Sequence, residues 1–172
     1  MAHGYGGTTI DRIAKSAGIS RASVYTYYPT KRDVLLATGV TAFADGESVI
    51  ARLNDLAVPA CVAELEKWAQ DYLDHLEQHG AFVLVFSQAA MDDPELRRVG
   101  IRECRRTARK LAAGLSRLRA ANRGEVPVDQ AVAVLAILER FAMWRASGMP
   151  LIGDDGAATV ARTIDAILRS DQ

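Results

Sequence analysis

Residues 4–35 read GYGGTTIDRIAKSAGISRASVYTYYPTKRDVL, and this stretch decides how the amino end of the chain folds. Thr8 or Thr9 can cap a helix whose apolar residues recur at the spacing of one helical face. Gly18 then stands where the left-handed residue that ends a helix belongs. The apolar face of this first helix consists of Ile10, Ile13, Ala14 and Ala17.

A second short helix follows the glycine. Ser20 can cap it, and Pro29 ends it near Tyr28. Ala14 is small enough for the second helix to cross over it, so we expect a helix-turn-helix. The core between the two helices is expected to contain Ile13, Ala17, Ile19 and Val24. The side chains left facing outward, toward a DNA major groove, are Arg21, Ala22, Ser23, Thr26 and Tyr27.

The remaining segments also have helical periodicity. Thr30 caps a third helix, with Asp33 placed as in a capping box, and this helix is predicted to run to about Leu53. Amphipathic or wholly apolar helices follow at about 61–80, 81–91, 94–121, 128–148 and 155–169. Aromatic residues make up only 6% of the chain and only five prolines are present, which favours helices over a β-sandwich. The sequence therefore predicts an all-α fold.

Charge is distributed unevenly along the chain. The 172 residues carry 21 basic and 21 acidic side chains, a balance that by itself argues against nucleic acid as a partner. Residues 1–33, however, hold five basic and two acidic side chains, and the other 139 residues have an acidic excess of three. A basic head on an acidic body favours a polyanion as the partner of the amino end.

No segment predicts export or membrane insertion. The longest wholly apolar run, Ala131–Leu138, is far shorter than the roughly 18 residues that span a bilayer, and no signal-peptide pattern opens the chain. Cys61 and Cys104 lack the spacing of a zinc site or a disulfide framework, and Cys104 falls on the apolar stripe of its helix, where we expect a buried thiol. We therefore expect a cytoplasmic protein without a cofactor.

The order and spacing of these residues resemble the TetR family of bacterial repressors over about residues 4 to 39. The matching residues are Gly4-Tyr5, Thr8-Thr9-Ile10, Ile13-Ala14, Ala17-Gly18-Ile19-Ser20, Val24-Tyr25-Thr26-Tyr27-Tyr28, Lys31 and Leu35. The resemblance implies a helix-turn-helix DNA-binding domain at residues 1–40 and a helical ligand-binding and dimerisation domain at 41–172. The region around 138–140 is in addition weakly similar to the EthR-like repressors of mycobacteria.

The resemblance also implies roles for individual residues on a double-stranded DNA operator. Thr9, Tyr25 and Lys31 would hold phosphates, and Lys31 would contribute charge and position rather than sequence reading. Base edges or neighbouring phosphates would be met by Arg21, Ser23, Thr26 and Tyr27, with Ser20 and Ala22 completing the DNA-facing set. Arg21 is the long donor fork on this helix and can pair bidentately with a guanine. Tyr28 occupies the family's buried aromatic position and is expected to pack in the core.

One departure from the family pattern concerns the amino end. Members of the family carry one more helix before the Gly-Tyr pair, where this sequence has Met1-Ala2-His3. Without that helix, Ile10, Ile13, Val24 and Tyr28 lose a surface that they normally pack against. Either this sequence lacks a helix that the whole protein has, or the protein starts at Met1, in which case we expect a poorly packed head with impaired DNA binding.

In the body, the resemblance implies a homodimer formed by the last two helices, about 128–148 and 155–169. Their surplus of apolar side chains agrees, because a monomer is expected to leave Val132, Ile164 or Leu168 exposed. A pocket for a small apolar effector is expected among the middle helices, although the same aromatic rings could simply fill the core. These rings are Trp68, Tyr72, Phe82, Phe86, Phe141 and Trp144. Glu139 and Arg140 are polar residues within an apolar helix and could orient a ligand, form ion pairs or lie at the dimer interface.

Two further patterns have simpler interpretations. His75 and His79 share a helix face with Asp71 and could in principle hold a metal ion, but this spacing is common on solvated helices, so we predict no metal site. The basic run from Arg97 to Lys110 could bind a second nucleic acid, but it is better explained as the solvated outer face of a long helix.

Three hypotheses follow from the sequence. The leading one is a homodimeric repressor that an apolar effector releases from its operator. The second is a dimeric ligand-binding protein of the same fold in which the shortened head no longer recognises DNA. The third, an all-helical enzyme, has little support, because the sequence contains no nucleophile–base pair, no paired carboxylates in an apolar setting and no phosphate-binding glycine loop.

Overall fold

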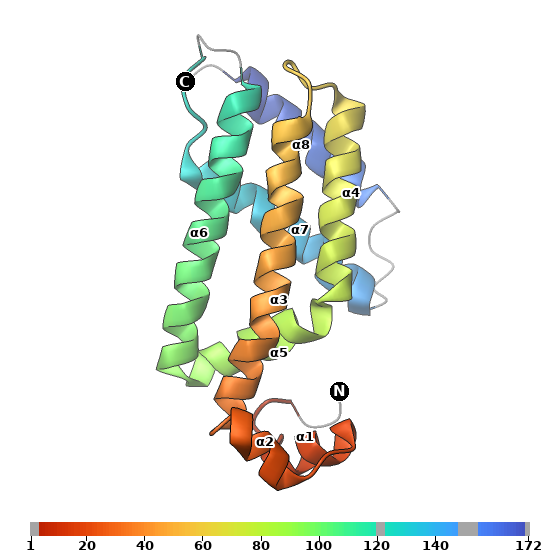
Figure 1. Cartoon of the computed structure of the whole chain (residues 1–172). Coiled ribbons are helices and arrows are strands. Elements are labelled where there is room, and N and C mark those ends of the chain that lie inside the picture. Colours follow the sequence, from red (N-terminus) through yellow and green to blue (C-terminus); the bar gives the residue numbers. More distant parts are fainter. Residues whose placement is uncertain (1–3, 120–122, 148–154, 171–172) are drawn as a thin grey trace.

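The computed structural model describes residues 4–119, 123–147 and 155–170, which form helices joined by short connections (Figure 1). In chain order the elements are α1 (Ile10–Ala17), α2 (Arg21–Tyr27), α3 (Lys31–Ala51), a 3-10 turn η1 (Arg52–Asp55), α4 (Val62–Gln78), α5 (Gly80–Asp92), α6 (Pro94–Leu118), α7 (Val128–Ser147) and α8 (Gly156–Arg169). The described residues contain no strand, which confirms the predicted all-α fold.

Local capping explains where the first helices begin and end. The side chains of Thr9, Ser20 and Thr30 each accept a hydrogen bond from the backbone N–H three residues later, which satisfies a donor that the helix start leaves free. The Asp33 carboxylate accepts a hydrogen bond from the backbone N–H of Thr30, which completes the predicted capping box. Gly18 ends α1 at φ 68°, in the left-handed region that glycine reaches without strain.

The body consists of α3 to α8, and the head of α1 and α2 lies beneath it (Figure 1). The main core joins α3, α4, α6, α7 and α8, and α4 packs closely along α8. Its large, fully buried side chains include Leu65, Leu73, Leu111, Leu115, Leu138 and Ile164. α3 runs from the head into the body as one continuous helix, so the boundary predicted at residue 40 falls inside it.

The core corrects two expectations about exposure. Ile164 and Leu168 are buried within the single chain, because α8 turns them toward α4 and α7, and only Val132 of the predicted trio is exposed. α5 is less enclosed than its composition suggests: Phe82 and Phe86 are buried, whereas Leu84 is 38% exposed.

The stretch Lys31–Asp55 has the length and hydropathy of a membrane span. Its apolar residues Val49, Ile50 and Leu53 are buried in the body's core. Glu47 on the same helix pairs with Arg106 and Lys110 of α6. This is the pattern of a helix packed among other helices.

Candidate functional site

The second helix of the head lies at the far tip of the molecule (Figure 1). Val24 is its one buried residue and packs on Ile10 and Ala14 of α1. Every other residue of α2 is exposed, and Tyr27 is 77% exposed. The predicted outward set, Arg21, Ala22, Ser23, Thr26 and Tyr27, is therefore accessible, together with Tyr25, which the family resemblance places on a phosphate.

Arg21 is held over this surface by two exposed partners. Its Nε lies 3.1 Å from Oδ1 of Asp11, and its guanidinium sits 5.3 Å from the centre of the Tyr25 ring. Arg21 Nη2 also donates to the Tyr25 hydroxyl at 3.4 Å. Solvent-exposed ion pairs of this kind are weak. The guanidinium is therefore pre-positioned at the start of α2 and can exchange Asp11 for another acceptor at little cost.

The hydroxyl groups of the predicted set mostly serve the helix itself. Ser20 accepts from the Ser23 backbone at 3.0 Å, and the two hydroxyl oxygens lie 2.8 Å apart. Thr26 donates its hydroxyl hydrogen to the carbonyl of Ala22. Thr9 caps α1 in the same way as Ser20 caps α2. Each of these hydroxyl oxygens still has a free lone pair, so it can accept a further hydrogen bond while its bond within the head remains in place.

Lys31, which is predicted to hold a phosphate, has partners within the head. Its ammonium donates to the carbonyl oxygens of Tyr5, Thr8 and Gly6 at 2.9, 3.3 and 3.4 Å, and it lies 4.4 Å from the centre of the Tyr5 ring. An ammonium has three donors, and these carbonyls use them. Lys31 thus fastens the segment before α1 to the start of α3, a structural function that the sequence analysis missed.

The small core of the head differs from the predicted one. Ile19 is 51% exposed and Ala17 is also exposed, so neither fills it. Tyr28 and Val34 complete the core instead. The expectation of a poorly packed head is wrong for Ile10 and Val24, which are 8% and 4% exposed. They find enough apolar surface on α1, α2 and the first turn of α3.

The head is tied to the body by ion pairs as well as by α3. Arg32 pairs with Asp93 and Glu95 at the start of α6, each at 2.6 Å. Tyr5 and Leu35 belong to the same apolar cluster as Phe82 and Phe86 of α5. The orientation of the head is therefore set by contacts with α5 and α6.

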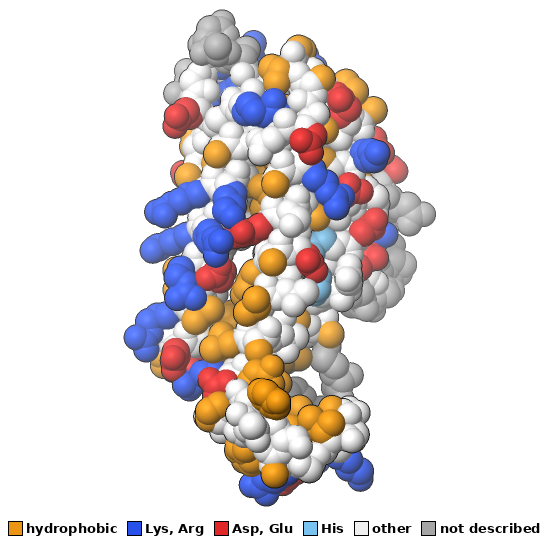
Figure 2. All heavy atoms as spheres, viewed as in Figure 1, with side chains coloured by type: hydrophobic (Ala, Val, Ile, Leu, Met, Phe, Trp, Pro, Cys, Tyr) orange, Lys and Arg blue, Asp and Glu red, His pale blue; other side chains and the backbone are white. Residues whose placement is uncertain are grey.

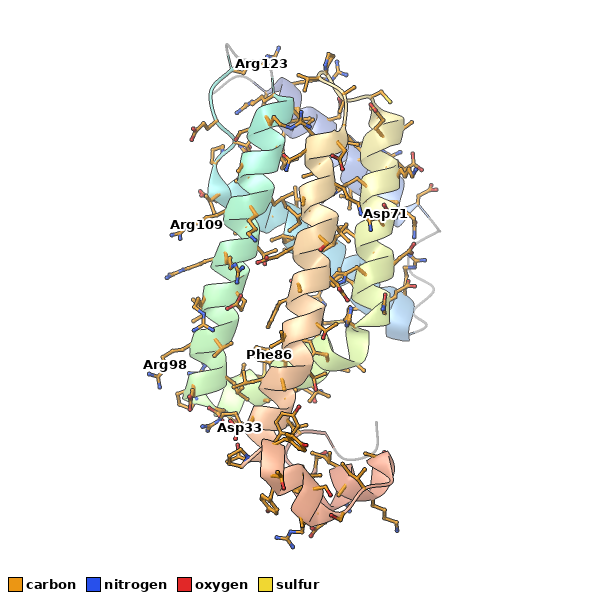
Figure 3. All side chains as sticks on the ribbon, in the orientation of Figure 1. Asp33, Asp71, Phe86, Arg98, Arg109 and Arg123 are labelled. Carbon is orange, nitrogen blue, oxygen red and sulfur yellow. The ribbon has the colours of Figure 1, made fainter. Side chains whose placement is uncertain are left out.

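A cavity of about 370 Å³ lies in the lower part of the body, between α3, α4, α5, α6 and α7. Phe86, on α5 at its floor, is labelled in Figure 3. Of the predicted ligand-contacting rings, Tyr72, Phe82 and Phe86 line it. At two glycines, α3 lies very close to the side chains that line the cavity. An added Cβ would lie 2.7 Å from Phe82 at Gly39 and 2.9 Å from His75 at Gly46.

Three of the predicted rings lie outside this cavity. Trp68 is buried in the main core, where its indole N–H donates to the carbonyl of Val49 at 2.9 Å. Phe141 packs against Gly156 at the start of α8. Trp144 lies next to Phe141 on α7, with ring centres 6.0 Å apart. Helical spacing predicted that these rings face inward, but not which of them would border the cavity.

Several polar residues line the cavity. His75 and His79 are half-buried in its wall rather than on a solvated face, with ring centres 5.0 Å apart, and His79 Nε2 lies 2.9 Å from Oδ2 of Asp45. Burial lowers the pKa of His75, and His79 lowers it further. Asp71 pairs instead with Arg52. Within the described ranges no three His, Cys, Asp or Glu side chains lie close enough together to hold a metal ion.

Cys104 and Glu139 also face this space. Cys104 lies on the inner face of α6 as predicted, but it is exposed rather than buried, because that face opens onto the cavity. Burial by the surrounding chain raises the pKa of the Cys104 thiol, and nearby Glu139 raises it further. Burial likewise raises the pKa of the Glu139 carboxyl. The sequence signal for both residues was their place on a helix face turned toward the interior.

The basic run of α6 forms the outer surface of that helix from Arg98 onward, whereas Arg97 lines the cavity. Figure 2 shows Lys and Arg side chains gathered along it, and Arg98 and Arg109 point away from the body in Figure 3. Arg102 pairs with Glu103, and Arg106 and Lys110 pair with Glu47. This placement agrees with a solvated face.

Comparison with known proteins finds a family model that matches the amino end and a solved structure with a similar fold. Residues 1–38 match the family model for bacterial regulatory proteins of the tetR family. Among solved structures, the chain is similar to the TetR family transcriptional regulator PfmR from Thermus thermophilus, with a TM-score of 0.71 and 22% sequence identity. That similarity covers 99% of this chain and 92% of the other. A search of curated protein sequences finds no match.

Proposed function

We propose that this chain, whose head matches the TetR family of bacterial regulatory proteins and whose fold is that of a TetR family transcriptional regulator, is a homodimeric cytoplasmic repressor. Residues 1–40 would read a double-stranded DNA operator, and residues 41–172 would bind a small lipophilic effector and dimerise. The observation that carries the proposal is the accessible surface of α2, with Arg21 held at its start beside Tyr25. A helix of this kind enters a major groove, where an arginine fork recognises guanine.

Coupling between effector and DNA is proposed to run through α3. This helix carries the head at one end and lines the cavity with Ala42, Phe43 and Gly46 further along. The cavity rings Phe82 and Phe86 also pack in the cluster that contains Tyr5 and Leu35. A ligand that pushes these rings or α3 changes the direction of the head. Effector and DNA must then weaken each other's binding by the same factor, because a coupling free energy is reciprocal.

The proposed dimer uses α7 and α8. α7 exposes Val128, Val132 and Met143 on one side, at 39%, 42% and 50%. These positions fall on one stripe of the helix. Exposed apolar side chains that share a helix face favour a protein interface, and the exposed Glu139 lies on the same face between Val132 and Met143. The support from α8 is weaker, because its apolar residues Ile164 and Leu168 are already buried in the single chain.

A fluorescence-anisotropy titration tests the DNA-binding part of the proposal. The labelled probe is the intergenic duplex upstream of the chain's own gene, and the control is a random duplex of equal length. We expect at least about a thousandfold preference for the intergenic duplex at physiological salt, as specific DNA-binding proteins show. Equal affinity for both duplexes would contradict it and favour a dimeric ligand-binding protein that has lost DNA recognition.

A further inference from the structure

The charged groups around the cavity are almost all paired within the chain. His79 contacts Asp45, and Glu103 pairs with Arg102 at 2.9 Å. Arg97 turns its guanidinium onto the carbonyl oxygens of Ala90 and Met91 at the end of α5. His79 and Glu103 therefore have oppositely charged or titratable partners, whereas the Arg97 guanidinium has hydrogen bonds to neutral carbonyls and, among the described residues, no acidic partner.

Glu139 is the exception. Across the described part of the chain, no side chain or backbone group donates a hydrogen bond to its carboxylate or forms an ion pair with it. It extends from α7 beside Leu135 in the cavity wall, near Tyr72 of α4, and its side chain is exposed to solvent. Water solvates this carboxylate in the free chain, so a cation that enters the cavity would be its first charged partner. Desolvation by the surrounding chain raises the pKa of the Glu139 carboxyl.

The neighbours of Glu139 do not supply the missing positive charge. Tyr72 stacks near His75, with ring centres 5.6 Å apart, and the lowered pKa of His75 keeps that imidazole neutral at pH 7. His75 also rests against Gly46 of α3, which leaves it little room to turn. The cavity thus combines one unpaired carboxylate with walls of Phe43, Phe82, Phe86 and Tyr72.

We propose that the effector of this protein is a lipophilic organic cation, whose ammonium group is held by the Glu139 carboxylate and the surrounding aromatic rings while its apolar body fills the cavity. This inference rests on the proposed function in taking the cavity as an effector site. Aromatic faces attract cations through their quadrupole, and a carboxylate in a partly desolvated site gains most from a positive partner. A lipophilic anion would meet the Glu139 carboxylate, and Arg97, the one Lys or Arg side chain among the described residues of these walls, already donates to two backbone carbonyls.

Three ligands with one decyl chain and different head groups test the proposal. Decyltrimethylammonium, decanol and decanoate are titrated into the full chain by isothermal calorimetry, each below its aggregation threshold. We expect the ammonium compound to bind about tenfold or more tighter than decanol, and decanoate to bind weakest. Decanoate binding as tightly as the ammonium compound, or no binding of the ammonium compound, overturns the proposal.

Matched variants locate the effect. Glu139→Gln keeps the size of the side chain and should reduce the affinity for decyltrimethylammonium about tenfold while leaving decanol unchanged. Glu103→Gln removes the other carboxylate that lines the cavity, one already paired with Arg102, and should leave the ammonium affinity within about twofold. If Glu139→Gln binds the ammonium compound as the original chain does, the proposal is wrong. Circular dichroism of both variants checks that the helices are intact.

The proposed function is tested separately from the ligand class. A chain that binds the ammonium compound through Glu139 without loosening its hold on DNA supports the ligand class and contradicts the proposed effector response. If decanoate releases the chain from DNA and decyltrimethylammonium does not, the result supports the effector response and overturns the proposed ligand class.

Discussion

At the scale of single residues, the head holds its DNA-facing side chains through weak, exposed contacts. Arg21 has an acceptor in Asp11 and a ring beneath it in Tyr25, and both partners are exposed. These contacts thus orient the Arg21 guanidinium, but they are weak enough for it to exchange them for contacts with DNA. A base edge in a DNA groove offers a better acceptor pair than a hydrated carboxylate.

Replacing Arg21 by Ala should therefore reduce sequence preference more than affinity. We expect the ratio of affinities for operator and random duplex to fall about tenfold or more, since a bidentate contact with guanine is lost. Asp11→Asn is the matched control, because it removes the internal partner of Arg21 and leaves the fork free. Competition anisotropy with both duplexes measures the ratio. An unchanged ratio in Arg21→Ala would exclude Arg21 from base reading.

Lys31 is a second single residue whose contacts matter, and these contacts lie within the head. Because its ammonium is used by the Tyr5, Gly6 and Thr8 carbonyls, Lys31→Ala should lower the free energy of unfolding by about 1–2 kcal/mol. Lys15→Ala, at the exposed end of α1, removes the same charge without these bonds and should leave stability nearly unchanged. Urea denaturation compares the two. Equal stability of the two variants would show that the Lys31 contacts contribute nothing.

His75 makes stability depend on pH. Its pKa in the folded chain lies below the usual 6.5, so below that pH the unfolded chain takes up a proton that the folded chain resists. The stability that the folded chain gains from keeping His75 neutral is fully present above about pH 6.5, and it is lost as the pH falls toward the lowered pKa. We expect His75→Gln to lose less stability than the original chain between about pH 7 and pH 5 in urea denaturation. Identical losses in both proteins would contradict this assignment.

At the scale of elements, α3 is the helix on which the proposal depends, because it joins the head to the cavity. Its start is fixed by the Thr30–Asp33 capping box, so Thr30→Ala should destabilise the chain by about 1 kcal/mol. Thr38→Ala, later in the same helix, removes a hydroxyl that only donates to its own helix at Val34 and should cost less. Thermal unfolding measures both variants. A larger loss in Thr38→Ala would contradict the capping argument.

Local sequence rules predicted well where the helices begin and end, and poorly what each helix face packs against. Thr9, Gly18 and Ser20 act within four residues of themselves, so their roles as caps could be identified from sequence. Cys104 and Leu168 depend on what stands opposite their helix faces: a cavity in one case and α4 in the other. Periodicity defines the apolar face of a helix, but tertiary packing decides which partner it meets.

At the scale of the whole molecule, the account requires two heads and therefore a dimer. Val132 lies in the exposed apolar stripe of α7, so Val132→Glu should place a charge in the interface and convert dimer to monomer at micromolar concentration. Met91→Glu is the control, since Met91 is a 75% exposed apolar residue on α5, outside the proposed interface. Sedimentation velocity separates the two species. A dimer in Val132→Glu would move the interface away from this stripe.

In the proposed function, α2 reads the major groove in both halves of a dimer. Methylation interference at guanine N7 tests it most directly, because N7 lies in the major groove and is the acceptor that an arginine fork would contact. We expect interference at guanines in two half-sites separated by about one helical turn or a multiple of it, and loss of that interference in Arg21→Ala. Binding to the intergenic duplex that guanine N7 methylation leaves unaffected would contradict the account.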